Sequence, residues 1–193
     1  MIRGSLARLV VIFLAALFLS SVAPKAAQQT ARPERFTAIA LPPMASGPAT
    51  PVDITVERWS TPVENERVMT ALTELGTKGI LQVLLKLPRV GSFGTTGNTG
   101  YPVRYAWKTT GPDGIERITL ATDRYVSFWE LSDQSRSLDY PITLITLRLK
   151  PGGSGDGEVA VAAKMVMDRV TKTIVVENYD LEPVRLTAVK RLR

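Results

Sequence analysis

The sequence contains no histidine and no cysteine. Histidine is the commonest general base and the commonest ligand of zinc, copper and nickel, and a thiolate is the nucleophile of cysteine enzymes. These two absences exclude Ser-His-Asp, Cys-His and zinc-hydrolase mechanisms within this chain, together with disulfides and a lipoprotein anchor on cysteine. We therefore predict no metal site, no cofactor and no catalytic residue, and a non-enzymatic role is favoured over an enzymatic one.

The sequence also has little excess charge of either sign. It has 24 lysines and arginines against 18 aspartates and glutamates, but Arg3, Arg8 and Lys25 lie in the first 27 residues. The other 21 basic residues exceed the acidic residues by only three. No run combines basic residues with aromatics, the pattern typical of nucleic-acid binding. Nucleic acid is therefore not an expected partner.

The N-terminal residues have the pattern of a secretory signal peptide. Arg3 and Arg8 precede the apolar run Leu9–Ala23, and small alanines follow it. This run is shorter than the ~20 apolar residues that span a bilayer comfortably. We predict a cleaved signal peptide at residues 1–27 and a periplasmic or extracellular protein. Because Pro24 disturbs the cleavage site, an uncleaved segment that contacts the membrane remains the alternative.

The rest of the chain divides into a linker and one domain. Residues 28–50 are rich in proline and alanine, and Pro42, Pro43 and Pro48 favour extended backbone without partners. We predict a flexible linker there. Residues 51–193 have the length of a single domain, and because disulfides are absent the core must stabilise it.

Hydrophobic periodicity predicts one strand, two helices and then further strands. Residues 52–59 alternate apolar and polar side chains, as a strand does. Thr61 and Glu64 form a capping box, Gly76 is placed to end a first helix and Pro88 to end a second. Strand patterns follow at residues 101–108, 115–122, 125–131, 138–149, 158–167, 173–176 and 184–189.

These patterns predict an α+β fold. Its sheet is a mostly antiparallel curved sheet or open barrel of about seven to eight strands, with a pair of short helices inserted after the first strand. The segment GSFGTTGNTG at residues 91–100 carries a glycine at every third position. A phosphate-binding loop would end in Gly-Lys-Ser/Thr and lead into a helix, whereas this segment leads into a strand. We interpret it as a mobile surface loop.

Four stretches combine aromatic and charged side chains in an unusual way. They are residues 53–61, 122–130, 136–145 and 176–189. Together they resemble a group of exported bacterial proteins with no assigned activity. The resemblance implies a recurring secreted module, and it assigns no functional residue.

Aromatic walls with a few polar groups are typical of ligand pockets. Five residues in or near these stretches are therefore candidate ligand-binding residues: Trp107, Arg124, Trp129, Asp139 and Tyr140. The alternative is that the tryptophans fill the core and the arginines bond to turns.

Three hypotheses of function follow. The first is a non-enzymatic module that binds a peptide or a small apolar ligand, for which a cavity lined by Trp107 or Trp129 would be evidence. The second is a structural or assembly factor of the cell envelope whose partner is an envelope protein, for which an exposed sheet edge or an exposed apolar face on the helical pair would be evidence. The third is a carboxylate-dependent hydrolase, which needs two of Asp123, Glu130 and Asp139 about 5–9.5 Å apart in one cleft.

Overall fold

The computed structural model describes residues 32–41, 48–124, 142–168, 173–179 and 183–192. Within these residues it has one helix and nine strands: β1 (Glu34–Leu41), β2 (Thr50–Val56), α1 (Pro62–Leu84), β3 (Gly91–Thr95), β4 (Tyr101–Thr110), β5 (Glu116–Thr122), β6 (Thr143–Leu149), β7 (Ser154–Asp168), β8 (Thr173–Tyr179) and β9 (Val184–Leu192). The predicted signal peptide and the predicted strand at residues 125–131 lie outside the described residues.

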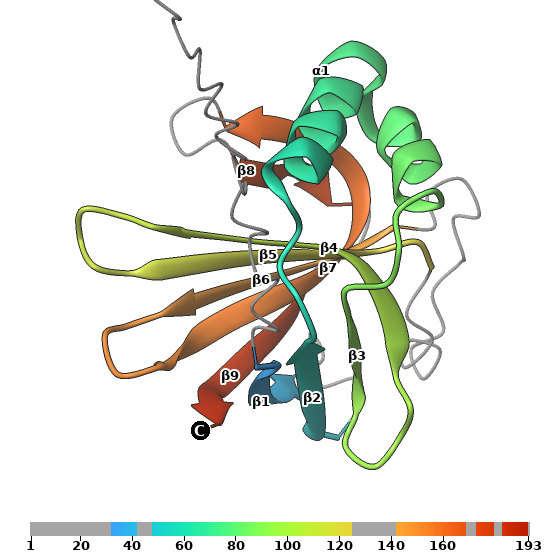
Figure 1. Cartoon of the computed structure of the whole chain (residues 1–193). Coiled ribbons are helices and arrows are strands. Elements are labelled where there is room, and N and C mark those ends of the chain that lie inside the picture. The colour runs from blue at the N-terminus through green and yellow to red at the C-terminus, as the bar shows by residue number, and fades with distance from the viewer. Residues whose placement is uncertain (1–31, 42–47, 125–141, 169–172, 180–182, 193) are drawn as a thin grey trace, which may run out of the picture. The chain divides into compact units, whose positions relative to one another are not determined.

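Eight strands close into an antiparallel barrel (Figure 1). Neighbours around the ring are β6, β5, β4, β3, β2, β1, β9 and β7, and pairing of β7 with β6 closes the ring. Apart from β8, strands that follow one another in the chain are neighbours in the barrel, which is the meander arrangement of up-and-down barrels. The prediction of a mostly antiparallel β structure is confirmed, and the sheet closes instead of remaining an open barrel.

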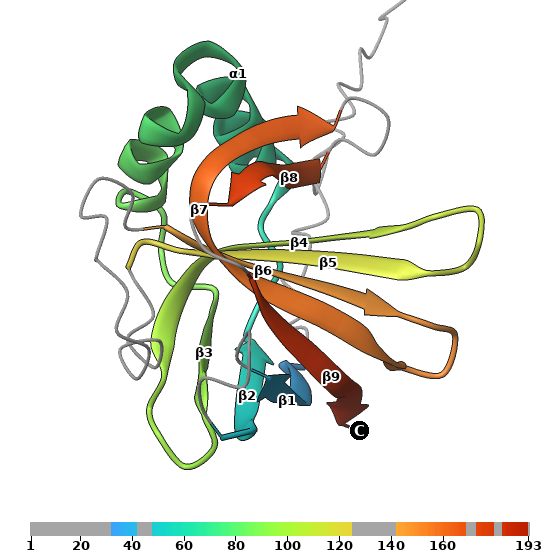
Figure 2. The ribbon, with the colours of Figure 1, turned by 180° about the vertical axis from the view of Figure 1, so that it is seen from behind.

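Strand β7 extends beyond the barrel. Its residues 154–161 pair with β6 or β9, whereas residues 162–168 pair with β8. Figure 2 shows this second part of β7 curving away from the barrel with β8 beside it. The chain then returns to the barrel wall as β9. The β7–β8 hairpin thus adds a surface outside the barrel against which the helix packs.

Two apolar clusters stabilise this arrangement. The barrel interior, which we call the inner core, takes side chains from all eight barrel strands, among them Phe36, Ile54, Phe93, Leu120 and Leu147. The outer core lies between α1 and the outside of the sheet and contains Val68, Leu72, Ile80, Leu84, Tyr105, Leu144, Met165 and Ile174. Burial of this apolar surface is the main stabilising contribution in a chain without disulfides.

The N-terminus of α1 is capped as the sequence predicts. Glu64 N donates to Thr61 Oγ1, and Thr61 N donates to a Glu64 carboxylate oxygen 2.8 Å away. Arg58 also donates two hydrogen bonds of 2.9 Å to Glu64. The Arg58 guanidinium and the Thr61 amide together lower the pKa of Glu64 to about 2. The reciprocal bonds set the residue at which the helix begins.

The predicted pair of separate short helices after the first strand is not shown. One helix, α1, follows two described strands and continues through Gly76, where φ is 64° and ψ is −155°. Gly76 leaves the helical region, as its predicted role at a helix end requires, and the two halves of α1 meet there at a kink. After the bend, Thr77 Oγ1 accepts a hydrogen bond of 3.1 Å from Met165 N of β7. This buried bond and the outer core hold the second half of α1 against β7.

The prediction of a flexible linker across residues 28–50 is wrong for residues 34–41. These residues form β1, which pairs with β2 on one side and β9 on the other. Phe36, Ala38 and Ala40 alternate into the inner core. Two of these three side chains are small, so the hydrophobic alternation is weak, and the prolines that follow suggest a linker. The described domain therefore begins before residue 51.

The prediction of a surface loop at residues 91–100 is wrong for residues 91–95, which form β3. Phe93 is buried in the inner core, and Gly91 pairs with Val56 of β2 and Val103 of β4. A Cβ on Gly91 would collide with the backbone carbonyl of Thr55. Glycine at this position thus allows close approach of two strands.

Replacing Gly76 with alanine is expected to lower the free energy of unfolding by about 1–2 kcal/mol. The positive φ of Gly76 is strained for any residue with a Cβ, and no atom lies within 4 Å of the position that a Cβ would take. The cost would therefore come from the backbone and not from a clash. Urea unfolding measures it, with Lys78→Ala as an exposed control on the same helix, expected to change stability by less than about 0.5 kcal/mol. Equal effects of the two substitutions would contradict this account of the bend.

Candidate functional site

The inner core leaves little space for a ligand among the described residues. All of its members are at most 3 % exposed, including the large side chains of Phe36 and Phe93. An eight-stranded barrel is just wide enough for its own side chains to fill it or for one small ligand. The described interior of this barrel is of the filled kind.

Four charged residues lie across one mouth of the barrel. Glu34, Lys108, Glu116 and Arg191 each lie two positions from an inner-core residue of their own strand, so they occupy inward-facing positions. Glu34 and Arg191 come from the adjacent strands β1 and β9, whereas Lys108 and Glu116 come from β4 and β5 on the opposite wall. We call these four residues the mouth cluster.

The mouth cluster is joined by ion pairs across the barrel. Lys108 Nζ donates to Glu34 Oε1 at 2.7 Å, and Arg191 Nε lies 3.2 Å from Glu34 Oε2. Arg191 also donates to Glu116. Trp59 Nε1 donates to Glu34 Oε1 at 2.9 Å, and Lys108 Nζ lies 4.4 Å from the centre of the Trp59 ring. The cluster and Trp59 thus connect opposite walls at the end of the inner core.

The electrostatics of Glu34 follow from these contacts. Partial burial by itself would raise the pKa of Glu34, but the hydrogen bonds from Lys108 and Trp59 and the charges of Lys108 and Arg191 outweigh it and lower the pKa. Glu34 is therefore ionised at neutral pH and bonded to three neighbours. Because its carboxylate is held by cations, it is a poor proton donor or acceptor near pH 7, and the mouth cluster is better suited to structure than to catalysis.

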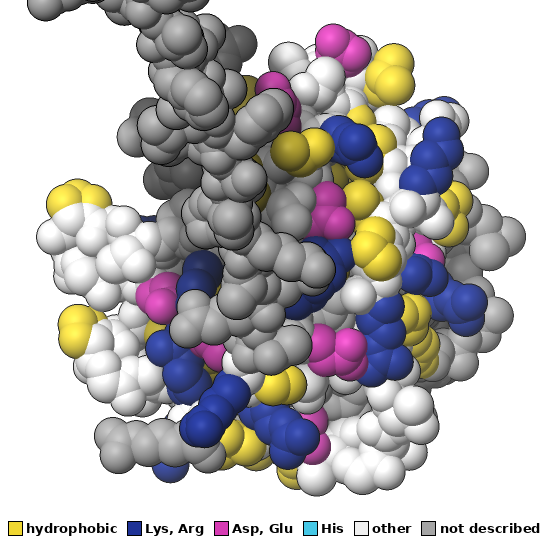
Figure 3. Space-filling view, viewed as in Figure 1, with side chains coloured by type: hydrophobic (Ala, Val, Ile, Leu, Met, Phe, Trp, Pro, Cys, Tyr) yellow, Lys and Arg dark blue, Asp and Glu magenta, His cyan; other side chains and the backbone are white. Residues whose placement is uncertain are grey.

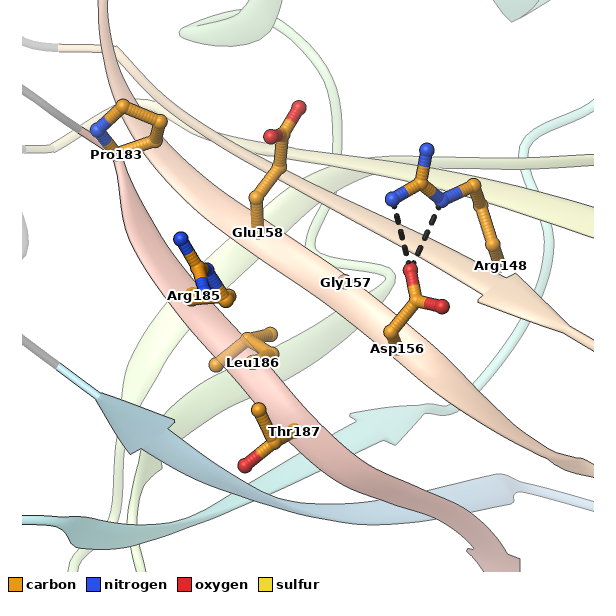
Figure 4. Close-up of a pocket in the computed structure, with 8 residues that line it drawn as sticks. All are labelled: Arg148, Asp156, Gly157, Glu158, Pro183, Arg185, Leu186 and Thr187. Atoms are coloured by element: carbon orange, nitrogen blue, oxygen red, sulfur yellow. Dashed lines mark hydrogen bonds and ion pairs between the residues drawn. The ribbon is translucent and has the colours of Figure 1, made fainter.

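A second feature is a pocket on the outside of the barrel between β6, β7 and β9 (Figure 4). It has a volume of about 340 Å³ and is lined by Arg148, Asp156, Gly157, Glu158, Pro183, Arg185, Leu186 and Thr187. Arg148 is paired with Asp156 through contacts of 2.8 and 2.9 Å. The lining carries two arginines and two carboxylates, so their formal charges balance and the pocket has no net preference for an anion or a cation.

A third feature is a groove of about 520 Å³ on the solvent side of α1. Seven residues between Val63 and Leu75 line it from the first half of the helix, and Val83, Lys86 and Leu87 line it from the second half and the turn that follows. Val63 is 57 % exposed, Leu75 is 64 % exposed and Leu85, on the same bent helix region, is 59 % exposed. Figure 3 shows hydrophobic side chains that reach the surface over α1 among charged ones. Large apolar side chains gathered at the surface are typical of interaction sites.

The structure describes two of the five candidate ligand-binding residues. Trp107 is partly buried against the outer core, outside the barrel. Arg124 follows β5 with an exposed side chain, and its carbonyl accepts hydrogen bonds of 2.6 and 3.2 Å from the hydroxyls of Thr122 and Thr143. Trp129, Asp139 and Tyr140 lie outside the described residues, so the grouping of the five residues remains a prediction.

Of the three carboxylates proposed for a hydrolase, the structure describes Asp123. Its side chain is 4 % exposed and accepts a hydrogen bond of 3.1 Å from Arg104 Nε. Arg104 also donates to the carbonyl of Leu87, at the end of the helical region, over 3.3 Å. Asp123 thus takes part in attaching the helix to the sheet. Glu130 and Asp139 lie outside the described residues, and the separation of the carboxylates stays untested.

Sequence reasoning missed the mouth cluster and the groove. The mouth cluster could have been recognised from charged residues at strand ends that are two positions from an inward apolar residue. Glu34 has this relation to Phe36 in β1. In β4 and β9 a β-bulge adds one residue to the strand, at Arg104 in β4 and around Ala188 in β9. The alternation of inward and outward residues therefore changes partway along each strand, and the sequence alone does not show that Lys108 and Arg191 point inward. The apolar side chains of the groove, Val63 and Leu75, gave no usable signal, since Leu75 is at helical spacing from Val68 and Leu72 and reads as part of the buried stripe.

Two kinds of site are absent from the described residues. No helix within the described ranges is long and apolar enough to cross a membrane, and no group of acidic residues there is placed to hold a metal ion. The resemblance to exported bacterial proteins remains a prediction. No family model matches the chain, and no match to it is found among the curated proteins or the solved structures.

Proposed function

We propose that this chain is a structural or assembly factor of the cell envelope that acts through protein contacts, with the groove of α1 as its docking surface. The observation that carries the proposal is the exposure of Val63 and Leu75 on α1 and of Leu85 at its C-cap, the first two lining a groove of about 520 Å³. Full burial of a valine or leucine side chain stabilises a protein by roughly 1.5–3 kcal/mol relative to exposure to water. A partner that covers them would recover part of this free energy.

The packed inner core supports this proposal over a ligand-binding barrel. In a binding barrel the inward residues line a cavity, whereas here the described inward residues are buried against one another. A peptide- or ligand-binding role would therefore use the surface, and for an apolar segment the groove of α1 is the better match. The envelope location rests on the N-terminal signal pattern and is part of the proposal.

Photo-crosslinking in the cells that export the protein tests the docking surface. We expect a photoreactive amino acid at position 75 to give a discrete adduct, because Leu75 lies at the edge of the groove. The same amino acid at position 185, on the outside of β9, is the matched control, since Arg185 is also exposed. Adding Leu85→Glu should reduce the adduct at position 75 several-fold by placing a charge beside the covered surface. Equal adducts at both positions, insensitive to Leu85→Glu, would refute the proposal.

A further inference from the structure

The first half of α1 presents one face to the groove. Seven of the residues that line the groove recur at helical spacing on this face: Val63, Glu66, Arg67, Thr70, Ala71, Glu74 and Leu75. Val68 and Leu72 of the same helix are buried in the outer core, and Leu75 lies at the boundary between their stripe and the outer face. Ala71 is only 7 % exposed, but the other six residues are exposed, so this outer face is a ridge that the described part of the fold leaves largely open to a partner.

The charges on this ridge are arranged in a pair. Arg67 and Glu74 are each the same number of residues from the point between Thr70 and Ala71. Seven residues of helix separate them by about 10 Å along the axis, which is too far for a bond within one helix. Among the described residues neither side chain has an ion-pair partner, unlike Arg58 and Glu64 at the start of the same helix.

We infer that the groove of α1 binds a second copy of this chain, with the two helices antiparallel and crossing at Thr70 and Ala71. In that arrangement Arg67 of each copy faces Glu74 of the other copy. The dimer therefore contains two identical Arg67–Glu74 ion pairs, one on each side of the twofold axis. Self-complementarity of this kind is what a twofold interface requires, because the same patch serves both partners. This inference rests on the proposed docking surface and names its occupant.

Side-chain size agrees with the crossing point. Thr70 and Ala71 are the smallest side chains of the ridge, and small residues at a crossing allow two helices to approach closely. Leu75 of one copy then faces the turn that carries Val63 and Glu66 of the other copy. Its apolar surface, which is 64 % exposed in a single copy, would be covered there. A different partner whose surface carried charges of only one sign would attract either Arg67 or Glu74 and repel the other residue of the pair.

The size of the surface predicts a weak dimer. Ten residues line the groove, fewer than the roughly 20–30 residues a side of a standard stable interface. We therefore expect a dissociation constant on the order of 10 µM. Sedimentation of the full chain, purified in the form in which cells accumulate it, should show a monomer–dimer equilibrium in this range, and dimerisation should weaken as the salt concentration rises.

A charge swap tests the occupant. Arg67→Glu alone and Glu74→Arg alone should each weaken dimerisation about tenfold, since each places like charges across both symmetric contacts. The double variant restores opposite charges and should regain most of the affinity of the parent chain. Arg185→Glu, which makes the same change of net charge on the outside of β9, should leave dimerisation unchanged. A double variant no better than the single ones would overturn the antiparallel pairing.

A single cysteine provides an independent readout, because the chain has none of its own. Thr70→Cys lies beside the twofold axis and should form an intermolecular disulfide under mild oxidation, whereas Thr110→Cys, in the β4–β5 hairpin, should not. A chain that stays monomeric at 100-fold above the expected constant overturns the second copy as occupant. If position 75 still gives a discrete adduct to another protein in cells, the docking function stands while this inference fails. If that adduct is also absent, both fail.

Discussion

Replacing Phe93 with alanine is expected to lower the free energy of unfolding by about 3–5 kcal/mol. Phe93 is 0 % exposed in the inner core, on a short strand whose other inward neighbour is a glycine. Removing its ring from a packed interior loses the transfer free energy of the ring and leaves a cavity that the closed wall cannot collapse to fill. Urea unfolding monitored by far-ultraviolet circular dichroism measures the loss.

The size of this loss also decides between two functions. If the barrel were a ligand cavity, Phe93 would line existing space, and its truncation would cost clearly less because the term for a new cavity would be missing. Phe93→Leu is the matched control, with an expected cost of roughly 1–1.5 kcal/mol because most of the volume is kept. The Phe93→Ala variant should also bind benzene, as dry apolar cavities do. Binding of benzene by the parent chain with equal affinity would restore the ligand-binding hypothesis.

Local signals in the sequence were sufficient for the helix start and for most strands. The capping box at Thr61 and Glu64 predicts the first turn of α1, and the structure confirms it. Strands β4, β5 and β9 were predicted because their inward positions carry large apolar side chains such as Val103, Ile118 and Leu186. These signals depend on neighbours within a few residues, and for that reason they are readable without a structure.

Strands β1 and β3 escaped prediction for a different reason. Each strand has one large inward side chain, Phe36 or Phe93, and small residues at its other inward positions, Ala38 and Ala40 in β1 and Gly91 in β3. Small side chains suit a barrel wall where strands and opposite walls approach closely, but they remove the alternation that identifies a strand. Closure of the barrel was not predictable either, since it depends on pairing of β1 with β9, whose residues lie at opposite ends of the domain.

The mouth cluster depends on the same long-range pairing. Glu34 and Lys108 meet because two walls face each other, although 74 residues separate them in the chain. Bulges in β4 and β9 shift the phase by one residue, so Lys108 and Arg191 face inward where a strict alternation would place them outside. The groove on α1 is a local feature, and its apolar positions were visible in the sequence, but only the structure shows that the described fold leaves them uncovered.

Replacing Arg191 with alanine is expected to lower the free energy of unfolding by about 2–3 kcal/mol at neutral pH. Arg191 bridges Glu34 and Glu116, so its removal leaves two partly buried carboxylates near each other with one fewer cation between them. Its side chain is still 32 % exposed, and water therefore reduces the loss below the value for a fully buried pair. Arg185→Ala, on the outer side of the same strand, is the control and should cost less than about 0.5 kcal/mol.

The loss should depend on pH with a defined sign. The pKa of Glu34 is lowered in the folded chain from its ordinary value of 4.5, so its contribution is present above that value and is lost as the pH falls through the folded pKa. Once Glu34 is protonated, its carboxyl group no longer needs the charge of Arg191. The stability difference between the parent chain and Arg191→Ala should therefore be largest near pH 7 and shrink as the pH falls below 4.5. A difference that stays constant down to pH 3 would show that Arg191 acts through packing, for example against the Phe36 ring 5.3 Å away, and not through its charge.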